Sequence, residues 1–234
     1  MTELASGPGL FLRRAWRNLN RRVSRVWLDM RGPRIEHDMI RLGSEGNGWY
    51  APSDLPEGAL CYCIGVGLDA SFDFELAARG AEVHAFDPTP LAIDYMARKN
   101  EDRVTFHPWG VLDSDSSMRL YFPMNTAHGS HFAEDLHGTG QYHEVPCYRM
   151  STILDRLGHR DRQIHLVKMD IEGSWFAALQ DMMASGIYPT FLEVEYDSPA
   201  PVWRVSKVAR LLESHGYALI LRDADNAIYK RVPS

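Results

Sequence analysis

The chain contains little cysteine and no long hydrophobic run. Of its 234 residues only Cys61, Cys63 and Cys147 are cysteine, which is too few for a disulfide framework. Cys61 and Cys63 alternate on a predicted strand, so we expect both on one face of it as small buried residues. The sequence also has no cluster of histidine and cysteine at the spacing of a zinc site, so we do not expect zinc. These absences predict a reduced, cytoplasmic protein.

Positive charge is concentrated near the N-terminus. The net charge is −6, although eight arginines lie between Phe11 and Arg34, so the rest of the chain is acidic. This distribution argues against nucleic acid as a partner. No apolar segment approaches the ~20 residues of a membrane-spanning helix. The N-terminal arginines also alternate with tryptophan and leucine instead of preceding the apolar block of a secretory signal.

The arginine-rich segment, residues 10–31, has the spacing of an amphipathic helix. Its apolar positions recur every three to four residues, at Trp16, Leu19, Val23, Val26, Trp27 and Met30. Two interpretations remain open. One is an accessory helix that packs on the core or on another subunit, and the other is a basic helix on an anionic membrane surface. We therefore divide the chain into an N-terminal extension, residues 1–37, and one domain, residues 38–234.

From Leu60 onward, predicted strands and helices alternate. The expected strands cover residues 60–64, 82–86, 104–107, 118–122, 144–149, 164–169, 190–196, 217–222 and 227–230, and the last two form a closing hairpin. Strands that alternate with helices indicate an α/β fold with a parallel sheet covered on both faces.

The most informative stretch is Leu60–Pro88, where a short apolar strand runs into Gly65-Val66-Gly67 and a second strand ends at Asp87. Glycines allow the backbone to approach a ligand closely, and a carboxylate at Asp87 can accept hydrogen bonds from ribose hydroxyls. The pattern fits G-x-G-x-x-A, which does not separate NAD from S-adenosylmethionine (SAM). An NAD-dependent oxidoreductase and a non-catalytic nucleotide-binding scaffold therefore remain alternatives.

The second half of the chain favours SAM. The segment LVKMDIEGS at residues 166–174 puts Asp170 directly after an apolar strand, where open α/β sheets bind ligands. With EVHAFDPTP at 82–90, RLGSEGNGWY at 41–50, HPWG at 107–110, NTAHGSHF at 125–132 and FLEVEY at 191–196, the chain resembles the FkbM-type SAM-dependent methyltransferases. The resemblance covers about residues 38–230. It implies a Rossmann-like sheet of seven strands whose last strand is antiparallel, and methylation of a hydroxyl on a carbohydrate or sugar-containing metabolite.

The cofactor would be held by residues of the first half. Gly65 and Gly67 form the loop beside the cofactor, and Asp87 binds the ribose. Asp69 either reaches the methionine amino group or caps the next helix. The resemblance assigns Trp109 and Gly110 to the adenine, and Trp109 either stacks on that ring or packs in the core.

Several carboxylates are expected to converge near the methyl donor. Asp170 and Glu172 follow one strand, and Glu195 lies near the end of the next. Like charges brought together require a cation or a raised pKa, and Mg²⁺ with oxygen ligands would also orient a sugar diol. The alternative is that Asp170 and Glu172 cap a helix, while Glu193 and Glu195 pair with arginines.

Methyl transfer to an alcohol requires a general base near the hydroxyl. Histidine suits this role near neutral pH, and the loop between the predicted strands at 118–122 and 144–149 is rich in it. The candidates are His131 first, His143 second, and then His128 and His137.

Overall fold

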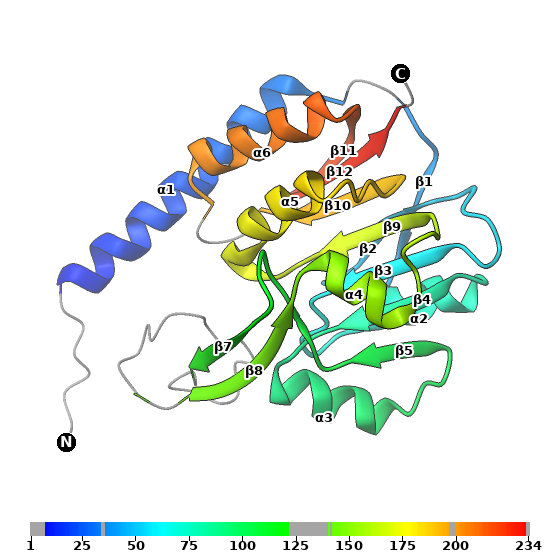
Figure 1. The fold of residues 1–234 in the computed structure, drawn as a ribbon. Helices are drawn as coiled ribbons and strands as arrows, with labels where there is room; N and C mark the ends of the chain where they lie inside the picture. The colour runs from blue at the N-terminus through cyan, green and yellow to red at the C-terminus, as the bar shows by residue number, and fades with distance from the viewer. Residues whose placement is uncertain (1–7, 34–35, 122–139, 141, 197–199, 233–234) are drawn as a thin grey trace.

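The fold is built on a seven-stranded sheet, seen in a computed structural model (Figure 1) that describes residues 8–33, 36–121, 140, 142–196 and 200–232. Its strand order is β11 (Tyr217–Asp223), β12 (Asn226–Arg231), β10 (Phe191–Glu195), β9 (Ile164–Met169), β3 (Leu60–Ile64), β4 (Glu82–Phe86) and β5 (Val104–His107). Only β12 runs antiparallel to its neighbours, β10 and β11. The expected seven-stranded α/β sheet with an antiparallel last strand and a closing hairpin is confirmed.

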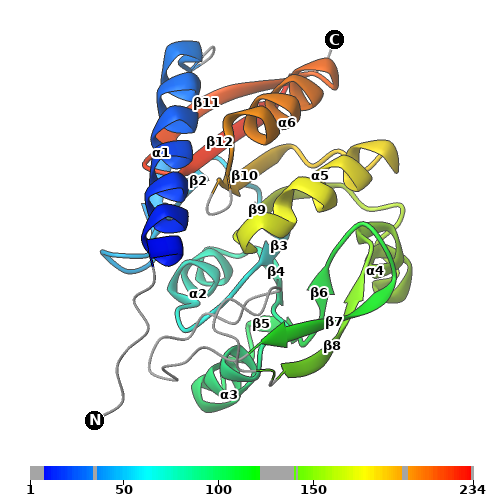
Figure 2. The same cartoon turned by 90° about the vertical axis from the view of Figure 1, so that its left-hand side faces the viewer.

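Helices cover both faces of this sheet (Figures 1 and 2). One face packs against α4 (Met150–Leu157), α5 (Trp175–Ala184), α6 (Val202–Ser214) and α1 (Pro8–Arg31). The other packs against α2 (Ser71–Ala78), α3 (Pro90–Lys99) and a hairpin of β1 (Met39–Leu42) and β2 (Trp49–Pro52). Cys61 and Cys63 are fully buried on this second face, as the sequence predicts.

Local sequence signals fix where α3 begins and where α4 ends. Thr89 caps α3 by accepting the N–H of Ala92 at 3.3 Å, and Pro90 occupies the first helical position. Helix α4 ends at Gly158, which has a positive φ of 70°, and the N–H of His159 then donates to the carbonyl of Leu154 at 2.8 Å. This is a Schellman termination, so the backbone that carries His159 is held firmly.

Helix α1 lies beside α6 in both views (Figures 1 and 2). Leu28 is buried in the main core, and the Ser24 hydroxyl donates to the carbonyl of Ala200 at 2.6 Å. Arg25 donates two hydrogen bonds to Asp225. The helix thus packs on the core, as one of its two interpretations expects. None of the described helices is long and apolar enough to cross a membrane.

A second sheet lies beside the carboxyl ends of the parallel strands. It contains β6 (Gly110–Val111), β8 (Tyr142–Tyr148) and β7 (Ser116–Tyr121), in that order. The sequence predicts both longer strands, and the structure starts each of them two residues earlier. Met118 and Leu120 of β7 face the cavity described next.

Candidate functional site

A cavity of about 380 Å³ opens at the carboxyl edge of the main sheet, within the range of roughly 300–1,000 Å³ that suits small-molecule sites. Its walls come from the ends of β3 and β4, from the segments that follow β5 and β9, and from β6 and β7. The lining residues are Ile64–Leu68, Phe86–Thr89, Trp109–Val111, Met118, Leu120, Asp170–Glu172 and Ser174. The cavity lies where the strand order reverses, between β3 and β9, which is the usual ligand position in such sheets.

Asp87 organises the glycine loop of this cavity. Its Oδ2 accepts the N–H groups of Val66 and Gly67, both at 2.9 Å. Its Oδ1 accepts the N–H of Thr89 at 2.8 Å and the hydroxyl of the same residue at 2.6 Å. Asp87 is only 6% exposed yet lines the cavity. It therefore stands where the sequence puts a ribose-binding acid, and it also holds the shape of the loop.

Glycine suits the two loop positions for different structural reasons. Gly65 has a φ of +89°, and a Cβ there would lie 1.8 Å from the carbonyl oxygen of Asp170. Gly67 has a φ of +57°, but a Cβ there would meet no atom within 4 Å. Gly65 therefore permits close packing between the ends of β3 and β9, whereas Gly67 leaves space open beside the cavity.

Asp69 does not line the cavity. Its carboxylate accepts hydrogen bonds from Ser44, from Asn47 at 3.2 Å and from the N–H of Ser71 at 2.9 Å. Of the two roles open in the sequence, this geometry corresponds to the helix start. The side chain ties the β1–β2 turn to the first residue of α2.

Trp109 lines the cavity and also packs among other rings. Its ring centroid lies 4.8 Å from that of His107 and 5.6 Å from that of Tyr148. At Gly110, a Cβ would lie 2.5 Å from the sulfur of Cys147. Both residues predicted for the adenine therefore border the cavity, and Trp109 is held in position from behind.

Two of the three predicted carboxylates, Asp170 and Glu172, line the cavity. The third, Glu195, ends the adjacent strand and contacts Asp170, as expected from the sheet order. Burial raises the pKa of Glu195 to about 8, and the charge and hydrogen bond of Asp170 add to this rise. Within the described part of the chain, these three carboxylates do not gather tightly enough to form a ready three-ligand metal site.

A buried charged group under the glycine loop is missing from the sequence prediction. Lys168 is only 4% exposed, and its Nζ donates to the carbonyl of Gly65 at 2.7 Å. Burial alone would lower the pKa of Lys168, but the charges of Asp73 and Asp170 outweigh it and raise that pKa. The signal available in the sequence is a single lysine inside the apolar strand IHLVKM.

Of the four predicted histidines, only His143 lies in the described part of the chain; His128, His131 and His137 fall outside it. His143 is on β8, directly opposite Leu120 of β7. Opposed residues of an antiparallel pair share one face of a sheet, and Leu120 lines the cavity. The register therefore puts His143 on the cavity-facing side of the second sheet.

Comparison with known proteins identifies one family model and two similar solved structures. Residues 62–219 match the methyltransferase FkbM domain. No curated protein matches the chain. The structure is similar to a TehB-like SAM-dependent methyltransferase from Corynebacterium glutamicum, with a TM-score of 0.39, 13% identity, and 76% of this chain and 82% of that chain covered. It is also similar to TYW2 of P. horikoshii in complex with MeSAdo, with a TM-score of 0.33, 10% identity, and 90% and 80% covered.

Both solved structures are too distant to bear on the activity of this chain. The FkbM match carries the assignment, because it spans more than half of the 234 residues and includes the glycine loop, Asp87 and Asp170. The chain belongs to the family of FkbM methyltransferase domains.

Proposed function

We propose that the protein is a SAM-dependent O-methyltransferase that acts on a hydroxyl of a carbohydrate or sugar-containing metabolite. The observation that carries this proposal is the cavity at the switch point of the sheet, whose glycine loop is fixed by Asp87. When bound, SAM supplies a methyl group on a positively charged sulfur. Gly67, Asp87 and Trp109 are the residues of this chain that would hold it.

The acceptor hydroxyl requires a group that removes its proton. His143 supports this role because it shares a sheet face with the cavity-lining Leu120, and a neutral imidazole accepts protons near pH 7. His131 and His128 are the other proposed bases, on the segment that leads into the same strand. Asp170 and Glu172 would hold neighbouring sugar hydroxyls, since carboxylates accept hydrogen bonds from them.

Transfer of a labelled methyl group from SAM to a panel of sugars and glycosylated metabolites tests the proposal. We expect labelled product, and a loss of turnover of about 10²–10⁴-fold when the base is replaced by alanine. The variants are His143→Ala, His131→Ala and His128→Ala. His37→Ala is the matched control, because its ring lies 3.1 Å from the carboxylate of Asp54, outside the residues that line the cavity. If none of the three variants loses turnover, the histidine base is wrong.

Mg²⁺ is the second element of this proposal. The contact between Glu195 and Asp170 supports it, since two carboxylates brought together suit a divalent cation with oxygen ligands. Glu172 would be the third oxygen ligand, and the ion would have to draw these carboxylates together, because they do not gather tightly without it. Titration of the protein with Mg²⁺ should show binding that Asp170→Asn abolishes. Turnover that survives both a chelator and this substitution would exclude the metal.

We propose further that this cytoplasmic enzyme associates peripherally with anionic membranes through α1. Helix α1 is rich in arginine and carries an exposed apolar stripe, formed by Trp16, Leu19, Val23, Val26 and Met30. A negatively charged lipid surface suits this helix better as a partner than the same positive helix of a second subunit does. Flotation with vesicles containing phosphatidylserine should recover the protein. Val23→Ser with Val26→Ser should abolish flotation, and recovery with neutral vesicles alone would contradict the proposal.

A further inference from the structure

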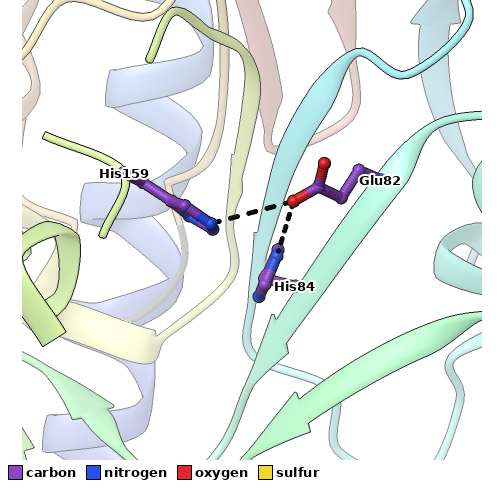
Figure 3. Close-up of side chains that lie close together, drawn as sticks. All are labelled: Glu82, His84 and His159. Carbon is purple, nitrogen blue, oxygen red and sulfur yellow. Dashed lines mark hydrogen bonds and ion pairs between the residues drawn. The ribbon is translucent and has the colours of Figure 1, made fainter. Parts of the chain in front are cut away.

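Three side chains at the opposite end of the sheet converge on one point (Figure 3). Glu82 is the first residue of β4, His84 lies two residues later, and His159 comes from the turn after α4. The Oε1 of Glu82 lies 3.3 Å from Nε2 of His84 and 3.7 Å from Nε2 of His159. All three ligand atoms lie within 4.8 Å of one another.

We propose that Glu82, His84 and His159 form a zinc site. Zn²⁺ takes nitrogen and oxygen ligands at roughly 2.0–2.1 Å, so tetrahedral ligand atoms lie about 3.4 Å apart. The separations of 3.3 and 3.7 Å match that spacing. Two imidazoles and one carboxylate leave a fourth position for water, which suits zinc better than the oxygen-seeking Mg²⁺ or Ca²⁺.

Each proposed ligand is also held by a neighbouring side chain, and both rings are held through the nitrogen that faces away from the centre. Nδ1 of His84 lies 2.9 Å from Nε2 of His107, and Nδ1 of His159 lies 2.8 Å from the hydroxyl of Tyr62. Arg162 donates two hydrogen bonds to the carboxylate of Glu82, at 2.7 and 2.6 Å. These contacts fix both rings so that Nε2 points at the shared centre.

Burial prepares the site without closing it. His84 and His159 are 8% and 7% exposed, whereas the side chain of Glu82 is 41% exposed. The exposed Glu82 gives the ion a path from solvent.

The site is connected to the cavity by a row of rings in contact, of which the first two are stacked. The ring of His84 stacks on His107 with centroids 5.2 Å apart and planes 7° apart. His107 in turn lies 4.8 Å from the cavity-lining Trp109. A zinc ion on Nε2 of His84 requires the proton on its Nδ1, which then donates to His107. Zinc should therefore hold His107 firmly behind Trp109.

The test is a calorimetric titration of the full-length, tag-free protein with Zn²⁺ after treatment with EDTA. We expect one equivalent to bind, with Glu82→Gln and His159→Gln each weakening the affinity at least tenfold. His37→Gln is the matched control. His37 also pairs with a carboxylate, but it belongs to no group of three metal-ligating side chains among the described residues. Co²⁺ should give the intense visible absorption of a tetrahedral site, and this absorption should be lost in both ligand variants.

Two results overturn the zinc site. One is the absence of zinc binding, and the other is binding that both ligand variants retain. Circular dichroism of each variant without metal shows whether it folds. If one ligand variant fails to fold, the other still tests the site. The connection to the cavity rests on the proposed function and has a separate readout: zinc should tighten SAM binding several-fold. Equal SAM affinity with and without zinc would overturn the connection, whereas a lack of any SAM binding would count against the proposed function.

Discussion

The carboxylate of Asp87 holds the backbone of Gly67. Its Oδ2 accepts the Gly67 N–H at 2.9 Å, and that atom also accepts the N–H of Val66 at the same distance. The residue expected to bind the ribose therefore also shapes the loop beside the cofactor. Loss of this carboxylate should affect loop order and cofactor binding together.

Asp87→Asn tests this dual role. The amide group would turn an N–H toward backbone N–H groups, so hydrogen bonds to a charged acceptor are lost at about 1.5–3 kcal/mol each. We expect a lower free energy of unfolding in urea and no measurable SAM binding. Asp94→Asn, an exposed acid on α3, is the matched control and should change neither quantity. Normal SAM affinity in Asp87→Asn would refute the role.

Gly65 and Gly67 should respond differently to alanine. At Gly65, the new Cβ would overlap the carbonyl of Asp170, so Gly65→Ala should destabilise the fold by about 3 kcal/mol or more. Gly67→Ala meets no atom and should cost about 1–2 kcal/mol from its left-handed backbone alone. Urea unfolding of both variants measures the difference. Equal destabilisation would contradict the account of close packing at Gly65.

Glu172 combines a strained backbone with a position in the cavity. Its φ is +48°, in the left-handed region that favours glycine. Glu172→Gly should therefore raise the free energy of unfolding by up to about 1 kcal/mol, while turnover falls because the carboxylate is gone. Glu172→Gln keeps the strain and should lower turnover without the gain in stability. A fully active Glu172→Gly variant would remove Glu172 from the site.

Glu193 makes the stability of the protein depend on pH. It is 0% exposed, and neither of its oxygens has a hydrogen-bond partner among the described residues. Burial raises its pKa well above the ordinary value. The folded state therefore holds a proton that the unfolded state releases above about pH 4.3. Stability should fall by about 1.4 kcal/mol per pH unit from about pH 5 upward, until the raised pKa is reached.

Glu193→Gln removes this titration. The difference in unfolding free energy between variant and wild type should grow in favour of the variant from about pH 5 upward. Urea unfolding at each pH unit measures it, and the comparison cancels groups that titrate in both proteins. Parallel curves would mean that Glu193 is already ionised in the folded protein.

The sequence predicts the parts of the fold and site that follow from local pattern. Buried strands such as LCYCI end in glycine or a carboxylate, and in a parallel sheet such ends meet at one edge. This reasoning brings Gly67, Asp87 and Asp170 to one cavity. It also predicts that Glu195 lies beside Asp170, because their strands are neighbours.

Pairings between distant segments lie beyond that reasoning. His84 and His159 meet only because β4 and the turn after α4 fold to the same edge, and nothing in their spacing marks them as partners. The same holds for Lys168 under Gly65, whose charge is balanced by Asp73 of α2. Asp69 shows the limit within a motif: its position suits either ligand or helix, and only its bonds to Ser44 and Ser71 distinguish the two.

Calorimetric titration of the protein with SAM, S-adenosylhomocysteine and NAD tests directly whether the cavity beside Asp87 is a SAM site. The cavity beside Asp87 predicts that both adenosyl compounds bind at one site per chain and that NAD does not. Binding of NAD alone would indicate an oxidoreductase, and binding of none of the three would contradict a cofactor site at the carboxyl edge of the sheet.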